Sequence, residues 1–209
     1  MLDTDWSDSW RDAFRIELRA EAIGLACHGW PVLPGTAPAT ESGDEAWSGP
    51  VPVHGDWADR LDAHPGEIAG WWDGDHPYSL LVATGEVVDA VEVGVELGKR
   101  AARLLRATGH PAPIVATPDG RWLFLSTVAD GLPERLAASD QIRWHGQGSW
   151  VPLPPTPFHH GVVHWRVKPD VLGWHLPQAA AVHSVLARAL DEAENRDWAQ
   201  QLVGASAAA

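Results

Sequence analysis

The sequence has few cysteines, few lysines and no long apolar runs, and each shortage excludes a class of protein. Cys27 is the only cysteine, which excludes an intramolecular disulfide framework and a cysteine-based zinc site and fits a reducing cytoplasm. Only two of the 15 basic residues are lysines, and 28 acidic residues leave a net charge of −13. Long-range attraction to nucleic acid or to an anionic membrane is therefore unfavourable, so any such binding must use a local patch.

No stretch of the chain is typical of a membrane or export segment. A membrane helix needs about 18 or more consecutive apolar residues, and no such run is present. The N-terminus is acidic and lacks the basic region and apolar core of a secretory signal. We therefore expect a cytoplasmic protein that neither crosses nor binds a membrane.

What the chain does have is an ordinary globular composition with an excess of tryptophan. Its 209 residues are 45% hydrophobic and 21% charged, which predicts one folded domain or one domain with an appendage. Thirteen tryptophans stand against three phenylalanines and one tyrosine. We expect most indoles to fill the core or lie over it, with stacking on a ligand as the alternative.

Helical and strand patterns are mixed along the chain without strict alternation. Helical spacing or capping signals predict helices over 9–28, 65–73, 95–108, 133–138 and from Pro177 onward, the first starting with a capping box at Ser9 and Asp12. Short apolar runs predict strands over 79–84, 87–93, 114–117, 121–127, 141–144, 149–153 and 162–167. The first two strands suggest a hairpin, residues 34–56 a long surface loop, and the tail from Gly204 a frayed end. This order favours an α+β domain.

Four segments, in order, carry a family resemblance. They are Ala26 to Pro34, Leu80 to Val93, Thr117 to Phe124, and Gly148 to Thr156 with Trp165 beyond. Over residues 15–168 the chain resembles the N-terminal domain of bifunctional DNA primase/polymerases, the Prim-Pol group of the archaeo-eukaryotic primase superfamily, and within it diverged, stand-alone actinobacterial members. The resemblance implies a mixed β-sheet with an RRM-like core, two divalent metals and template-directed nucleotide transfer. It implies a Prim-Pol-like domain over 1–168, with residues 169–209 as a helical extension packed on it.

The first family signature is a pair of carboxylates at acid-x-acid spacing, which places both on one face of a strand. Glu92 matches the first acid, but Gly94 stands at the second position. Asp89 is an odd number of residues from Glu92 and faces the other side of a regular strand. Glu96 would supply a partner only if the strand continued through Gly94, whereas the sequence from Val95 onward predicts a helix. Two metals need several converging carboxylates, and this strand offers one.

The other two family signatures are also altered. In the family a Gly-rich turn is followed by a histidine that contacts nucleotide phosphates, but this chain has Trp122 at that position, after Gly120 and Arg121. Indole has no basic nitrogen, although the Arg121 guanidinium can still contact phosphate. The third position, an acid, falls near Gln141 or, with a shifted alignment, Asp140.

We therefore predict a primase-like fold without its catalysis, acting as a nucleotide-, nucleic-acid- or protein-binding regulatory module. Glu92, Asp89 and Asp140 are the degenerate catalytic candidates, and the expected ligand site is formed by Arg121, Trp122, Arg143 and Gly120. No cofactor is expected; Mg²⁺ or Mn²⁺ would bind, through Glu92, only if the chain is active. One alternative is an active metal-dependent DNA primase/polymerase that uses Glu92 with Asp89, Glu96 or Asp140. Another is a protein-interaction adaptor, suggested by the acidic surface and the Trp-rich loops.

Three further groups of residues have a functional and a structural interpretation. A group of three histidines could ligate a metal, but it has no carboxylate among its members. A stripe of three basic residues on the predicted helix over 95–108 could contact phosphate, but such a stripe is typical of a solvated helix face. Two tryptophans on predicted strands could stack bases or fill the core. These groups are His159, His160 and His164; Lys99, Arg103 and Arg106; and Trp150 and Trp165.

Overall fold

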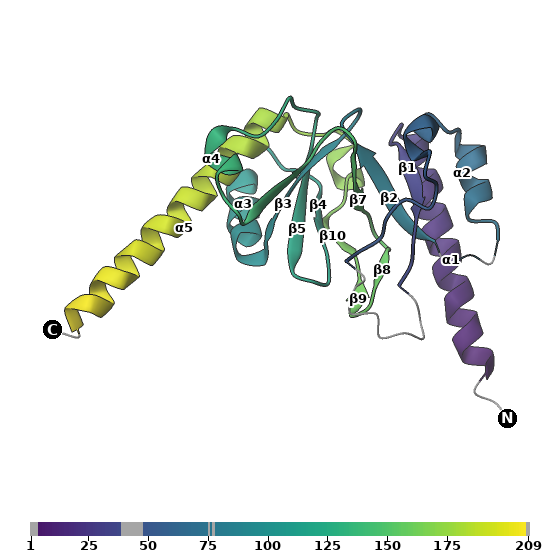
Figure 1. Ribbon diagram of the computed structural model, residues 1–209, viewed down its shortest axis with the longest axis horizontal. Helices are drawn as coiled ribbons and strands as arrows, with labels where there is room; N and C mark the ends of the chain where they lie inside the picture. The colour runs from purple at the N-terminus through teal and green to yellow at the C-terminus, as the bar shows by residue number, and fades with distance from the viewer. Residues whose placement is uncertain (1–3, 39–47, 75, 77, 208–209) are drawn as a thin grey trace.

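The computed structural model describes residues 4–38, 48–74, 76 and 78–207, and Figure 1 shows their arrangement. The helices are α1 (Thr4–Cys27), α2 (Pro65–Trp71), α3 (Val95–Ala107), α4 (Glu134–Ala137) and α5 (Ala179–Ala207), with 3-10 turns η1 (Trp57–Arg60) and η2 (Asp170–Leu172). The strands are β1 (Val32–Gly35), β2 (Ser79–Thr84), β3 (Asp89–Gly94), β4 (Ile114–Ala116), β5 (Arg121–Ser126), β6 (Ile142–His145), β7 (Ser149–Pro152), β8 (Pro157–Phe158), β9 (Gly161–Val162) and β10 (His164–Val167).

Two antiparallel sheets form the centre of the molecule. The larger has the order β10-β4-β5-β3-β6, the smaller the order β1-β2-β7, and β8 and β9 form a separate ribbon. The predicted α+β class is confirmed. The resemblance led us to expect a mixed sheet, but every strand pair in the described part of the chain is antiparallel.

The larger sheet is covered by helices on one face. Side chains alternate across a strand, so Val91 and Val93 of β3 and Phe124 of β5 share one face, where they are buried against α3 and α5. Leu97, Ala101 and Leu105 form the buried stripe of α3 at i, i+4 and i+8 spacing; they are grouped in the same core. Figure 1 shows α3 and α5 together on this side of the sheet, with the C-terminal part of α5 extending beyond it.

The other face of the larger sheet packs partly on the smaller one. Ala90, Leu123 and Leu125 are buried in one cluster with residues of β2, β7 and α1, among them Leu80 and Val151. The smaller sheet covers only part of this face, which leaves the ends of β3, β5 and β6 open to a cavity described below.

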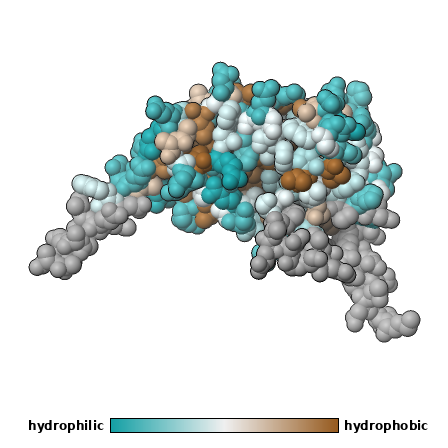
Figure 2. Space-filling view, in the orientation of Figure 1, coloured by the Kyte–Doolittle hydropathy of each residue, from teal (hydrophilic) through white to brown (hydrophobic). Residues whose placement is uncertain are grey.

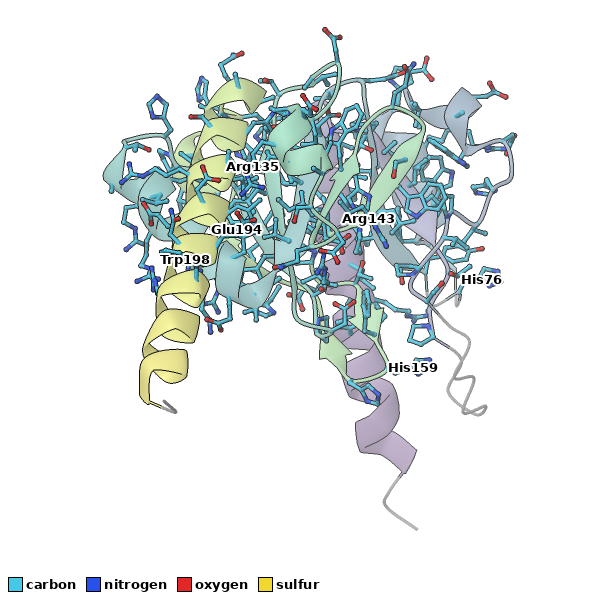
Figure 3. The ribbon with its side chains drawn as sticks, turned by 60° about the vertical axis from the view of Figure 1, so that its left-hand side comes forward. His76, Arg135, Arg143, His159, Glu194 and Trp198 are labelled. Atoms are coloured by element: carbon cyan, nitrogen blue, oxygen red, sulfur yellow. The ribbon has the colours of Figure 1, made fainter. Side chains whose placement is uncertain are left out.

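Exposed ion pairs connect the short helix α4 to α5. Arg135 Nη2 lies 2.8 Å from an Asp191 carboxylate oxygen and 2.6 Å from one of Glu194, and Figure 3 shows Arg135 and Glu194 on this helical side. On the face shown in Figure 2, hydrophilic residues predominate and hydrophobic ones form small patches. Among the described helices, none has the length and apolarity needed to cross a membrane.

The predicted helices over 65–73, 95–108 and 133–138 correspond to α2, α3 and α4, but other details differ. α1 begins at Thr4, so Ser9 lies inside the helix and is not its N-cap. The predicted strands over 79–84 and 87–93 do not form a hairpin, because β2 and β3 belong to different sheets. α5 continues through Ala207, past the predicted end at Gly204. Of the predicted loop over 34–56, residues 39–47 lie outside the described part, and Gly35 and Pro52 form a β-bridge.

Candidate functional site

A cavity of about 400 Å³ opens on the face of the larger sheet that is turned away from α3 and α5. Its charged lining residues come from β3, β5, β6 and the β4–β5 turn, and its aromatic ones include residues of β7 and β8. The described lining residues are Ser48, Gly49, Pro50, Val51, Glu92, Thr117, Asp119, Arg121, Leu123, Arg143, Trp144, His145, Ser149, Trp150, Pro152 and Phe158.

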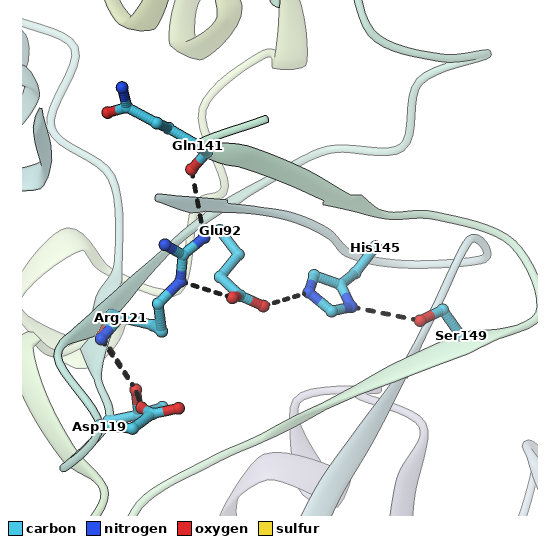
Figure 4. Close-up of polar contacts among 7 residues, drawn as sticks. Glu92, Asp119, Arg121, Gln141, His145 and Ser149 are labelled. Atoms are coloured by element: carbon cyan, nitrogen blue, oxygen red, sulfur yellow. Dashed lines mark hydrogen bonds and ion pairs between the residues drawn. The ribbon is translucent and has the colours of Figure 1, made fainter. Parts of the chain in front are cut away.

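Glu92 is the centre of a polar network in this cavity (Figure 4). Its Oε1 accepts a hydrogen bond from Arg121 Nε at 2.7 Å, and its Oε2 lies 2.8 Å from His145 Nε2. The side chains of Glu92 and His145 are each only 14% exposed, so both contacts are largely shielded from water. Strand register explains the contact, because Ala90 is opposite His145 and Glu92 reaches that histidine diagonally.

The network keeps Glu92 ionised. Burial raises the pKa of this carboxyl, but the hydrogen bonds from His145 and Arg121 outweigh burial and lower the pKa from 4.5 to about 2. A carboxylate can only accept hydrogen bonds, so His145 must donate from Nε2. In neutral His145 the other nitrogen, Nδ1, is then an acceptor, and it lies 3.3 Å from the hydroxyl of Ser149.

Two arginines contribute positive charge to the same face. Arg121 also donates from Nη2 to the carbonyl of Gln141 at 3.2 Å, which fixes its guanidinium between β5 and the start of β6. Arg143 is directly opposite Glu92 in the β3–β6 register, and its side chain is exposed. Within the described residues Arg143 has no ion-pair partner. Figure 3 shows it on the strand side of the molecule, away from Arg135 and Glu194.

The turn between β4 and β5 brings an acid to the cavity. The hydroxyl of Thr117 donates to the Asp119 carboxylate, and the backbone N–H of Arg121 donates to the same hydroxyl at 3.2 Å. Gly120 has φ of +82°, a conformation that glycine adopts without strain, and completes this turn. Gly120, which we predicted for the ligand site, precedes Arg121 in this turn but is not among the described residues that line the cavity.

The structure brings together some of the predicted site residues. Glu92, Arg121 and Arg143 line one cavity, as predicted. Trp122, which we also predicted for the ligand site, does not line this cavity. Because it follows Arg121 on a strand, its indole faces the opposite side, where it is 7% exposed in the core with α3. There the Arg166 guanidinium lies 5.1 Å from the centre of its ring.

The other acidic candidates do not join Glu92. Asp89 is 1% exposed on the helix-covered face, where its Oδ2 accepts from the backbone N–H of Ala129 at 2.9 Å. Asp140 is exposed in the turn before β6 and does not line the cavity. Glu96 lies in the first turn of α3 and is paired with Lys99 at 2.7 Å. None of these three acids is among the described residues that line the cavity with Glu92.

The donor set of the cavity does not fit the two divalent metals that the family resemblance implies. Glu92 and Asp119 are the carboxylates among its described lining residues, and both Glu92 oxygens are engaged by cationic or imidazole donors. In the part of the chain that the structure describes, no three His, Cys, Asp or Glu side chains gather as a metal site. A Cβ added to Gly94 would lie 3.8 Å from Arg121 Nη1. The position at which the family signature has its second acid therefore faces the Glu92 network.

Several cavity residues were not predicted from the sequence. His145, Ser149 and Asp119 carry the polar contacts beside Glu92, and Phe158 adds an aromatic wall. For His145 a signal exists, because it is two residues from Arg143 and so shares its strand face. The pairing of β6 with β3 is what makes that face the one of Glu92, and a single sequence does not give this pairing.

The remaining tryptophan, histidine and lysine candidates are spread over different parts of the fold. Trp150 lies at the cavity and donates to the carbonyl of Pro50 at 3.1 Å, whereas Trp165 is in the other sheet and donates to Glu21 at 3.1 Å. They are therefore not a pair on neighbouring strands. His160 and His164 are exposed, and Lys99 is on the solvent face of α3.

Fold and cavity together define a two-sheet α+β domain with an arginine-lined, partly acidic groove. The family model for the N-terminal domain of bifunctional DNA primase/polymerase, Prim-Pol, matches residues 22–182, more than half of the chain. The chain therefore belongs to the Prim-Pol family, and the match extends past residue 168 into the first turn of α5.

The similarity to solved structures is at a low level. The crystal structure of the catalytic domain of primase Repb' in complex with initiator DNA shares 15% identity with this chain. The match covers 86% of this chain and 97% of that one, with a TM-score of 0.36, and the family assignment does not depend on it. No curated protein matches the sequence.

Proposed function

We propose that this Prim-Pol domain is a binding module that holds the phosphates of a nucleotide or of single-stranded nucleic acid in its cavity, without metal-dependent nucleotidyl transfer. The observation that carries the proposal is the state of Glu92, whose two carboxylate oxygens are held by Arg121 and His145.

Nucleotidyl transfer by two metals needs carboxylates around ions about 4 Å apart, which stabilise the attacking and leaving oxygens. Glu92 can ligate a metal only after the contacts with Arg121 and His145 are broken. Those contacts are strong enough to lower its pKa to about 2. Gly94 supplies no second ligand on the same strand face. The domain is therefore expected to be inactive as a polymerase.

Phosphate binding is supported by the charges that remain available. Arg143 lines the cavity and is exposed, and a guanidinium matches a phosphate with two parallel hydrogen bonds. Arg121 adds a second positive charge, while Trp150 and Phe158 offer aromatic faces for a base. In a chain with a net charge of −13, this groove is the local patch that a phosphate ligand requires.

Calorimetric titration of the full chain with a deoxynucleoside triphosphate and with a short oligodeoxythymidylate, at low salt, tests the proposal. Replacing Arg143→Ala should weaken binding by about 10- to 100-fold, the effect of losing a charge-assisted contact. The matched control is Arg106→Ala, which removes the same charge from the exposed last turn of α3. Absence of binding, or equal weakening by both variants, would overturn phosphate binding at this groove.

Primer synthesis and extension assays test the second half of the proposal. With Mg²⁺ or Mn²⁺ present, the wild-type chain should give no product above background. Product formed by the wild-type chain and abolished by Glu92→Gln would contradict it and establish the active-enzyme alternative.

A further inference from the structure

The polar contacts of the cavity form a directional relay from a hydroxyl to a carboxylate (Figure 4). Ser149 Oγ lies 3.3 Å from His145 Nδ1, and His145 Nε2 lies 2.8 Å from Glu92 Oε2. Because the ionised Glu92 can only accept, the Nε2 proton belongs to that bond. Ser149 must then donate its proton toward Nδ1 of neutral His145. A hydroxyl, a basic nitrogen and an orienting carboxylate in this order are the elements of nucleophilic catalysis.

We propose that Ser149, His145 and Glu92 form a nucleophilic centre that transfers the acyl group of a carboxylic ester. Ser149 is the nucleophile, His145 the general base and acid, and Glu92 the residue that orients His145. This activity is separate from the phosphate binding proposed above, since it needs no nucleotide and can be measured when nucleotide binding fails.

The base and the nucleophile of this relay are in strands of two different sheets. His145 ends β6 in the larger sheet and Ser149 begins β7 in the smaller one. The turn between them is fixed by the backbone N–H of Ser149, which donates to the Gly146 carbonyl at 3.2 Å, and by the Thr84 hydroxyl, which donates to the same carbonyl at 2.6 Å. The nucleophile and base are thus positioned by rigid elements rather than by a free loop.

The proposed reaction needs only these three residues, an ester and water. Ser149 Oγ bonds to the ester carbonyl carbon while its proton passes to His145 Nδ1, and the Glu92 carboxylate stabilises the resulting imidazolium. When the bond to the alcohol oxygen breaks, His145 returns the proton to that oxygen. Water then attacks the acyl-serine by the same proton route, which releases the carboxylic acid and restores Ser149.

The surroundings define the class of ester. Arg143 is two residues from His145 and shares its strand face, and in this proposal its guanidinium stabilises the carbonyl oxygen that becomes negative. The apolar wall of the cavity, with Trp150, Pro152 and Phe158, accepts an acyl chain. At about 400 Å³ the cavity fits small esters rather than long-chain lipids.

A fluorophosphonate probe and p-nitrophenyl butyrate, applied to the full chain in EDTA, test the inference. We expect covalent labelling at Ser149, located by peptide mass spectrometry, and hydrolysis that falls at least about 100-fold in Ser149→Ala and His145→Asn. The control Ser184→Ala, an exposed serine that follows a histidine on α5, should retain full activity.

Because His145→Asn could disturb the turn, the wild-type chain supplies an independent test. Hydrolysis should disappear in proportion to the fraction of Ser149 labelled. A wild-type protein that is not labelled at Ser149, or whose hydrolysis persists after complete labelling, would overturn the inference.

Discussion

Replacing Glu92 by glutamine removes the charge on which the cavity network depends. Glutamine keeps the size of the side chain, but its amide cannot offer two anionic acceptors to Arg121 and His145. The Arg121 guanidinium then remains beside β3 with the carbonyl of Gln141 as its other acceptor. Removing the Glu92 charge from this shielded ion pair leaves the Arg121 charge poorly compensated. We therefore expect the substitution to lower the free energy of unfolding.

The lowered pKa of Glu92 sets how much stability the substitution removes and how that loss depends on pH. Lowering the pKa from 4.5 to about 2 corresponds to about 3 kcal/mol of stability, at about 1.4 kcal/mol per pH unit. The folded-state pKa is below the unfolded value, so this contribution is complete above pH 4.5 and is lost as pH falls toward 2. At pH 3 about 1 kcal/mol of it should remain.

Urea unfolding followed by circular dichroism, at pH 7 and at pH 3, measures this difference. Glu92→Gln should lower the free energy of unfolding by about 2–3 kcal/mol at pH 7, equivalent to about 5–10 °C in Tm, and by about 1 kcal/mol at pH 3. The control Glu96→Gln removes an acid that is 72% exposed and should change stability little at either pH. No loss at pH 7, or the same loss at both pH values, would refute the reasoning.

Two backbone positions near the cavity give further predictions. Gly94→Asp should fold with a urea midpoint close to wild type, because its added Cβ meets only Arg121 Nη1 at 3.8 Å; a large fall in the midpoint would show that packing requires glycine there. Gly85→Ala should lower the free energy of unfolding by at least about 2 kcal/mol, because φ is +101° and the added Cβ would lie 2.2 Å from the Cα of Gln147. A wild-type unfolding curve for that variant would contradict the close contact of this glycine with the β6–β7 turn.

Local patterns predicted the elements, whereas long-range pairing decided the arrangement. The helix predicted over 95–108 is confirmed as α3, in which Leu97, Ala101 and Leu105 are buried at i, i+4 and i+8. The hairpin predicted around Gly85 was wrong because β2 pairs with β1 and β7, which are distant along the chain. Partner choice between strands depends on which faces must be buried together, and one sequence does not encode that in any local signal.

In the candidate site, too, local patterns placed some residues correctly, whereas long-range strand pairing decided the position of others. Strand alternation correctly placed Asp89 on the face opposite Glu92, and the same rule separates Trp122 from Arg121, so both could not line one groove. Assigning Trp122 to the site by its position in a family motif overlooked this alternation. His145 was missed because its contact with Glu92 depends on the β3–β6 register.

The most direct test of the account is the metal dependence of ligand affinity. Calorimetric titration of the wild-type chain with a deoxynucleoside triphosphate is run once in EDTA and once in Mn²⁺. Because Arg143 and Arg121 supply the positive charge and both carboxylate oxygens of the ionised Glu92 are held by Arg121 and His145, the two dissociation constants should agree within about threefold. Binding that requires Mn²⁺, and that is lost in Glu92→Gln, would show that Glu92 is a metal ligand and contradict the account.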